Sequence, residues 1–186
     1  MTRHLPSRLT LNRQPFFGPD PASPAAQALL TVLLAQDGST TRLCEALSDG
    51  PLTLQVLLQQ PVTEPPAVVR QALPEGPWIE RVSSLVAHGQ VLTDNLVYIA
   101  TPAVEPALAD GLHSGHQPIG QLLRGRFTQR RFLNDAAPLF ERLWQQVGSP
   151  DPAASRAYVL STPQGPLMVV VEAFRRGLRA SSIASA

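Results

Sequence analysis

Lysine is absent from this 186-residue chain, and all 15 basic residues are arginine. This absence excludes chemistry that requires a lysine amine, such as Schiff-base formation, attachment of pyridoxal phosphate or the phosphate contact of a P-loop. Cysteine occurs once, at Cys44, so an intrachain disulfide is impossible. A chain with one cysteine is compatible with a reducing compartment.

The chain also lacks an excess of charge of one sign and a long apolar run. Its 15 basic and 14 acidic residues leave a net charge of +1, so no overall field favours nucleic acid or an anionic membrane. No stretch approaches the roughly 18 apolar residues of a spanning helix, and residues 1–24 hold no signal-peptide apolar segment. We therefore expect a cytoplasmic protein with no nucleic-acid partner and no membrane insertion.

The apolar content that is present suffices for one core, since 44% of the residues are hydrophobic. Residues 1–24 are rich in proline, arginine and polar groups, and we interpret them as an N-terminal arm. A single domain is expected over residues 25–179, followed by a flexible tail at 180–186. No hydrophobic helix face is clearly left over, so a monomer is the expected state.

Hydrophobic periodicity and turn residues predict a mixture of helices and strands. The expected helices cover residues 25–35, 103–112, 119–124 and 138–147, with a further short helix capped by Thr40 or Thr41. The expected strands cover residues 52–60, 78–88, 91–100, 127–133, 156–161 and 166–174. The first is expected to place Leu54, Val56 and Leu58 on one face, and a proline-broken loop follows it. Tight turns at His88-Gly89-Gln90 and Pro163-Gln164-Gly165 join strands as hairpins. This order predicts an α+β fold with an antiparallel sheet of about six strands.

One carboxylate is unusual for its position. Glu172 lies in the apolar run 166–174, whose bulky and β-branched residues are typical of a strand covered on both faces. An ionised carboxylate there is costly unless a cation or a ligand meets it, which is typical of a general acid or base. The alternative is that the strand ends early and Glu172 reaches solvent beside Arg175 and Arg176.

Three other patterns carry weaker information. His113-x-x-His116 has no neighbouring metal-ligand set, so an incidental role is favoured and no metal is expected. Cys44 has no recognisable catalytic partner and is interpreted as a small buried side chain. The basic cluster formed by Arg124, Arg126 and Arg130-Arg131 favours a solvated strand edge over a nucleic-acid site.

Four separated segments together resemble the chorismate lyase (chorismate pyruvate-lyase) family. They are Asp37-Gly38-Ser39-Thr40-Thr41-Arg42-Leu43, Trp78-Ile79-Glu80-Arg81, Gln117-Pro118-Ile119-Gly120, and the run from Pro166 to Phe174. Their order and spacing match the family from about residue 25 to 176, and the match is closest to its divergent cyanobacterial and actinobacterial branch. The longer N-terminal arm and residues 138–154 depart from the family pattern.

The resemblance implies a site. Arg81 corresponds to the arginine that grips the carboxylate of the aromatic product, a contact that suits a guanidinium. The backbone N–H groups of Thr40 and Ile119 correspond to two main-chain donors to the same carboxylate. Glu172 corresponds to the carboxylate that faces the ring hydroxyl. The resemblance further implies that helical flaps around Thr40 and Ile119 cover a buried ligand.

It also implies an activity, the elimination of pyruvate from chorismate to give 4-hydroxybenzoate, with no metal or organic cofactor. Our hypothesis is that Arg81 anchors the ring carboxylate while Glu172 holds the C4 hydroxyl, either as a base or as an orienting acceptor. The second substrate carboxylate needs another cation, for which Arg42 and Arg130 are both candidates. Downstream use in plastoquinone or ubiquinone biosynthesis is expected, and the sequence does not choose between them.

Two further hypotheses come from other classes of protein. A non-catalytic sensor of small aromatic acids uses the same fold in some bacterial repressors, but the first 24 residues are too short and too proline-rich for a DNA-binding helix-turn-helix. A small protein-interaction module predicts no affinity for aromatic acids. Without the resemblance, Arg81 is interpreted as a surface residue paired with Glu80 or Glu141.

Overall fold

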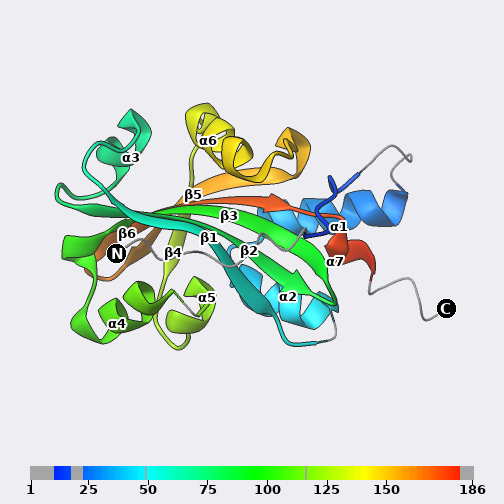
Figure 1. The fold of residues 1–186 in the computed structure, drawn as a ribbon, viewed down its shortest axis with the longest axis horizontal. Helices are drawn as coiled ribbons and strands as arrows, with labels where there is room; N and C mark the ends of the chain where they lie inside the picture. The colour runs from blue at the N-terminus through cyan, green and yellow to red at the C-terminus, as the bar shows by residue number, and fades with distance from the viewer. Residues whose placement is uncertain (1–10, 18–22, 49, 116, 181–186) are drawn as a thin grey trace, which may run out of the picture.

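The computed structural model describes residues 11–17, 23–48, 50–115 and 117–180. Its centre is a six-stranded sheet in the order β1-β2-β3-β6-β5-β4, and every neighbouring pair is antiparallel. Helices pack on both faces and at one end of this sheet (Figure 1). The fold class is therefore α+β with a six-stranded antiparallel sheet, as the sequence predicts.

The strands are β1 (Thr53–Val62), β2 (Trp78–Ala87), β3 (Gln90–Ala100), β4 (Gln129–Phe132), β5 (Ser155–Thr162) and β6 (Gly165–Phe174). The helices are α1 (Pro24–Ala35), α2 (Thr40–Ser48), α3 (Ala67–Ala72), α4 (Pro106–Ser114), α5 (Ile119–Leu122), α6 (Ala137–Val147) and α7 (Gly177–Ala180). Two 3-10 turns, η1 (Thr101–Ala103) and η2 (Pro152–Ala154), precede α4 and β5.

The two expected hairpins form the centre of the sheet. His88 and Gly89 connect β2 to β3, and both have positive φ angles, of 49° and 72°. Positive φ at both turn residues matches the twist of paired strands, so this turn sets the pairing as far as Val86↔Val91. A bulge then shifts the register by one residue between Val86 and Leu85. The second hairpin pairs β5 with β6 and closes at Thr162↔Gly165.

The two faces of the sheet are covered by different helices (Figure 1). On one face, α3 and α6 cover a core that includes Val69, Leu139 and Leu143. On the other, α4 and α5 cover a second core that includes Leu108 and Leu112. A third core, around Leu33, Cys44 and Phe174, lies where α1, α2 and α7 meet the end of the sheet. Because β6 is covered on both faces, its continuous apolar run agrees with the expectation for a buried strand.

Two local expectations are wrong. The proline-broken loop after β1 contains the helix α3, which begins after Pro66 because proline at a helix start sacrifices no hydrogen bond. Leu54 and Leu58 were expected on one face of a regular strand, but the pairing of β1 with β2 shifts between Val56 and Leu58. This bulge changes the alternation, so Leu54 lines a cavity while Leu58 packs on the α3 and α6 side.

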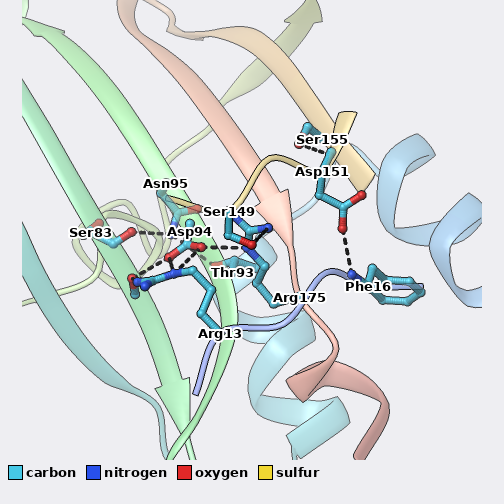
Figure 2. A network of polar contacts seen from close by, with 11 residues as sticks. Arg13, Phe16, Ser83, Thr93, Asp94, Asn95, Ser149, Asp151, Ser155 and Arg175 are labelled. Atoms are coloured by element: carbon cyan, nitrogen blue, oxygen red, sulfur yellow. Dashed lines mark hydrogen bonds and ion pairs between the residues drawn. The ribbon is translucent and has the colours of Figure 1, made fainter. Parts of the chain in front are cut away.

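Residues 11–17, which belong to the expected N-terminal arm, lie against the domain. Phe16 is fully buried in the third core, and its N–H donates to Asp151 Oδ2 at 2.7 Å. Arg13 and Arg175 converge on the buried carboxylate of Asp94 (Figure 2), with Nε–Oδ2 distances of 2.8 and 2.7 Å. This segment is therefore tied to β3 and to the end of β6.

Candidate functional site

A cavity of about 380 Å³ lies between one face of the sheet and the segments that contain α2 and α5. Its walls include residues 37–42 from the start of α2, residues 118–120 from the start of α5, and residues 123–128 that follow α5. The sheet contributes both apolar and polar side chains. Loops and short helices thus close a site whose floor is the rigid sheet.

Glu172 is buried, with 4% of its surface exposed, and it lines this cavity. The strand therefore does not end early, and the solvent-exposed alternative for Glu172 is wrong. A cation meets the carboxylate: Arg156, opposite it on β5, places Nη2 2.7 Å from Oε2. The other oxygen, Oε1, accepts a hydrogen bond of 3.1 Å from the hydroxyl of Tyr158.

Arg156 is itself held on all sides. Its Nη1 donates to the carbonyl oxygens of Leu34 and Gln36, at 3.2 and 2.6 Å, and its Nη2 donates to Thr40 Oγ1 at 3.1 Å. It also lies over three aromatic rings, those of Phe132, Tyr158 and Phe174, at 5.4 to 5.9 Å from their centroids. Because these contacts fix the guanidinium of Arg156, it holds the carboxylate of Glu172 in one orientation.

Tyr158 connects this ion pair to the cavity, which it lines. Burial and the nearby Glu172 carboxylate raise the pKa of the Tyr158 hydroxyl well above its ordinary value. The phenol therefore stays protonated at neutral pH and acts as a hydrogen-bond donor to Glu172.

Arg81 lies on β2, on the same face of the sheet as Glu172, and lines the same cavity. Only 1% of its surface is exposed. Its Nε donates to Gln59 Oε1 at 2.6 Å and its Nη2 donates to the carbonyl of Leu112, while Nη1 is buried without a hydrogen-bond partner among the described residues. Burial lowers the pKa of the guanidinium, because the charged form is poorly solvated. An anion in the cavity would accept a hydrogen bond from Nη1 and would also compensate for the poor solvation of the charge.

The surface interpretation of Arg81 is therefore wrong. Its neighbour Glu80 points to the other face, where it accepts hydrogen bonds from Arg142, Gln60 and Tyr98. Alternation along a strand separates the two side chains. Arg81 therefore lines the cavity, whereas Glu80 forms its hydrogen bonds on the opposite face of the sheet.

Thr40 and Ile119 are the first residues of α2 and α5, and both line the cavity. First-turn N–H groups have no partner inside a helix, so both are available as donors. Gly120 lets the two segments approach: a Cβ there would lie 2.5 Å from Thr41 Oγ1 and 3.0 Å from Ser39 Oγ. The two segments therefore pack closely where they line the cavity.

The two candidates for a second cation also line the cavity, but they differ in environment. Arg42 is exposed to solvent. Arg130 is half-buried, its Nη1 donates to the carbonyl of Asp37, and its Nε is buried without a hydrogen-bond partner among the described residues. Its guanidinium lies 5.5 Å from the centroid of the Tyr158 ring.

Other sequence patterns lie apart from this chemistry. Among the described residues no three His, Cys, Asp or Glu side chains are grouped so as to hold a metal ion. The side chain of His113 and all of His116 lie outside the described residues. Cys44 is buried in the third core, where desolvation and Glu172 raise the pKa of its thiol far above the ordinary value. It is a packing residue there, since a protonated thiol is a poor nucleophile.

All four residues singled out from the sequence thus line one cavity, namely Arg81, Thr40, Ile119 and Glu172. Sequence reasoning missed Arg156 and Tyr158, although both lie on the strand expected to pair with the strand of Glu172. Counting outward from Thr162↔Gly165 places Ser155 opposite Glu172, whereas the observed partner is Arg156, because the register shifts between Leu160 and Ser161. In a hairpin without a bulge, counting from the turn would identify the residue opposite Glu172. The bulge in this hairpin makes that count wrong by one residue.

The fold and this cavity define an α+β domain with a partly open site that is lined by arginines and one buried carboxylate. The family model described as chorismate pyruvate-lyase, Rv2949c-like, matches residues 34–181. The chain therefore belongs to the Rv2949c-like chorismate pyruvate-lyase family, and the resemblance seen in the sequence is confirmed.

Other comparisons are more distant. The gene product SA0254 from Staphylococcus aureus subsp. aureus N315 is 16% identical, with a TM-score of 0.44 over 69% of this chain and 86% of that chain. The effector domain of PhnF from Mycobacterium smegmatis is 12% identical, with a TM-score of 0.45 over 74% of this chain and 88% of that chain. Similarity at this level says nothing about ligand or activity. A search of curated proteins finds no match.

Proposed function

We propose that the protein is a chorismate lyase, which converts chorismate to 4-hydroxybenzoate and pyruvate. The observation that carries this proposal is the placement of a buried guanidinium, Arg81, and a buried carboxylate, Glu172, on the floor of one cavity. The family match supports the reaction, and the cavity supports the substrate class.

The strand register supports the fit to a para-substituted ring. Arg81 pairs with Val97, and Val97 with Val170, whereas Glu172 lies one row further along the same face. Arg81 and Glu172 are therefore two strands apart, which separates their backbones by roughly 10 Å across the sheet. A ring with a carboxylate at one end and a hydroxyl at the other can lie between the two side chains.

In this proposal Arg81 binds the ring carboxylate, assisted by the N–H groups of Thr40 and Ile119. Glu172 accepts the hydrogen bond of the C4 hydroxyl through Oε1, since a carboxylate oxygen has two lone pairs and the donor to Oε1 among the described residues is Tyr158. Loss of the C4 hydrogen as a proton and cleavage of the ether bond at C3 make the ring aromatic. The side chain leaves as the enolate of pyruvate, and it becomes pyruvate when a proton adds to its methylene carbon, so the proton lost from C4 is balanced. Orientation and exclusion of water are the main contributions required of the protein.

The two segments that cover the cavity suggest how water is excluded. The segments at Thr40 and Ile119 act as flaps in this proposal, and they must separate for the product to leave.

We further propose that the protein acts as a monomer in the cytoplasm. No helix among the described residues has the length and apolarity needed to cross a membrane. The 4-hydroxybenzoate would then enter the biosynthesis of a quinone such as plastoquinone or ubiquinone.

The test is to incubate the purified chain with chorismate, without added metal or cofactor, and to follow pyruvate and 4-hydroxybenzoate together. Equimolar release is expected, with strong loss in Arg81→Gln and Glu172→Gln and little change in Arg131→Gln. Arg131 is a suitable control because it is exposed on the same strand as Arg130 but does not line the cavity. If chorismate stays intact while 4-hydroxybenzoate binds, the protein is a ligand-binding domain and not a lyase.

A further inference from the structure

The cavity holds two guanidinium groups with unmet hydrogen-bonding capacity. Arg81 Nη1 and Arg130 Nε are both buried and, among the described residues, neither has a hydrogen-bond partner. Both side chains line the cavity. A buried N–H on a charged group is costly without an acceptor, so each is a candidate to receive an anionic oxygen from a ligand.

The two arginines come from widely separated strands. Arg81 lies on β2, whereas Arg130 lies on the edge strand β4, where it pairs with Leu160. Three strands lie between β2 and β4 in the sheet. Four strand spacings separate their backbones by roughly 19 Å across the sheet, so the two donors are suited to a ligand with two separated carboxylates.

Arg130 is held in place from two sides. Its Nη1 donates to the carbonyl of Asp37, at the start of the segment that leads into α2. Its guanidinium lies near the ring of Tyr158, whose hydroxyl donates to Glu172. The cation is therefore positioned beside the group that is proposed to hold the ring hydroxyl.

The other arginines around the cavity are less suited to this role. Arg42 and Arg124 are exposed, so water already satisfies them. Arg126 forms an ion pair with Glu105. An exposed or already paired cation gains less from a second anion than a half-buried one with an unmet donor.

We infer that Arg130 is the second anion-binding residue of the site, and that the cavity selects a dicarboxylate over a monocarboxylate. This inference rests on the proposed function and makes it more specific: Arg130 binds the enolpyruvyl carboxylate of chorismate while Arg81 binds the ring carboxylate. Elimination detaches the enolpyruvyl group, so the product keeps the Arg81 contact and loses the Arg130 contact.

Two aromatic ligands that differ by one carboxylate test the inference without turnover. These are 3-(carboxymethoxy)-4-hydroxybenzoate and 4-hydroxy-3-methoxybenzoate, which share the ring carboxylate and the para hydroxyl. Calorimetric titration of the full chain should show that the dicarboxylate binds about tenfold to a hundredfold more tightly, as a charge-assisted hydrogen bond predicts. In Arg130→Gln this preference should vanish, while affinity for the monocarboxylate changes less than about threefold.

Two control variants sharpen the result. Arg131→Gln removes the same charge from the next residue and should keep the full preference. Arg130→Lys keeps the charge and should retain part of it, whereas Arg81→Gln should weaken both ligands together. In turnover, Arg130→Gln should raise KM for chorismate more than it lowers kcat.

Three outcomes would overturn the inference. The first is a wild-type chain that does not distinguish the two ligands. The second is an Arg130→Gln chain that loses both ligands equally, which would mean that Arg130 only holds Asp37 in place. The third is Arg131→Gln losing the preference as fully as Arg130→Gln. If the wild type prefers the dicarboxylate through Arg130 but releases no pyruvate from chorismate, the proposed lyase activity fails and this inference stands.

Discussion

Arg156 and Glu172 form a buried ion pair behind the cavity, with Nη2 and Oε2 2.7 Å apart and each side chain at most 5% exposed. Glu172 reaches the cavity, whereas Arg156 is not part of its lining. A buried pair of this kind adds little net stability, but loss of one partner leaves an uncompensated charge. Arg156 is therefore a positioning residue for the carboxylate at the centre of the proposed mechanism.

Glu172→Gln should consequently destabilise the fold as well as affect the site. We expect a loss of about 3 kcal/mol in the free energy of unfolding, measured by urea denaturation, because Arg156 would remain charged and buried. Adding Arg156→Met should restore part of that loss. The matched control Glu45→Gln, which removes a half-buried carboxylate bonded to Gln121, should cost about 1 kcal/mol. Equal losses of unfolding free energy in Glu172→Gln and Glu45→Gln would contradict the interpretation that Arg156 depends on Glu172 for its buried charge.

Arg81→Lys should fail to replace the native guanidinium. Three nitrogens are required, for Gln59, for the carbonyl of Leu112 and for a ligand carboxylate, and a single ammonium cannot reach all three directions. Titration calorimetry should show at least a roughly tenfold loss in affinity for 4-hydroxybenzoate. Arg131→Lys serves as control and should bind like the wild type. Full affinity in Arg81→Lys would show that charge alone is sufficient.

Gly120→Ala should push apart the two segments that pack against each other in the cavity wall. The added Cβ would lie 2.5 Å from Thr41 Oγ1 and 3.0 Å from Thr41 Cβ, so α5 or α2 must move. We expect a cost of about 1–3 kcal/mol in unfolding free energy and weaker binding of 4-hydroxybenzoate. At Gly38, in the same wall, a Cβ meets only the flexible end of Gln36, at 3.3 Å. Gly38→Ala should therefore have the smaller effect, and the reverse order would refute this packing argument.

Asp94→Asn should be more damaging than Arg13→Ala. Asp94 is fully buried and serves both Arg13 and Arg175, so its neutralisation leaves the fully buried Arg175 without a carboxylate (Figure 2). The expected cost is about 3–5 kcal/mol. Arg13→Ala keeps the inner pair and should cost roughly 1 kcal/mol. Urea denaturation of both variants measures the difference, and similar values would mean that the arm contributes as much as the inner pair.

The pH dependence of stability should reveal the contribution of the ionised Glu80 carboxylate. Burial acts to raise its pKa, but hydrogen bonds from Arg142, Gln60 and Tyr98 outweigh burial and leave the pKa below the ordinary value of 4.5. A carboxyl whose pKa is lowered on folding stabilises the protein above its unfolded pKa and loses that contribution as pH falls through the folded value. The stability difference between wild type and Glu80→Gln should therefore be largest at neutral pH and shrink below about pH 4.5. A difference that is constant from pH 7 to pH 3 would show that the charge of Glu80 is irrelevant.

Much of the fold could be predicted from the chain itself, because the decisive signals are local. His88-Gly89 specifies a tight hairpin, and the apolar run of β6 specifies a strand buried on both faces. Glu172 in that run required a cation or a ligand, and the structure supplies Arg156. The helix α3 could not be predicted in this way. It is short, so its hydrophobic periodicity covers too few residues to be recognised, and it follows a proline-rich segment that is typical of a loop.

The sequence by itself favoured the residue types at the site, because in a lysine-free chain with one carboxylate in the buried run 166–174 the permanently charged partner must be arginine. The tertiary structure alone decided which arginine does so. A register shift between Leu160 and Ser161 moves Arg156, and not Ser155, opposite Glu172. A one-residue shift changes which side chain faces the partner strand, and it arises from pairing between strands that no local pattern reports. The proposed choice of Arg130 over Arg42 likewise rests on burial, which depends on how β4 and the start of α2 pack together.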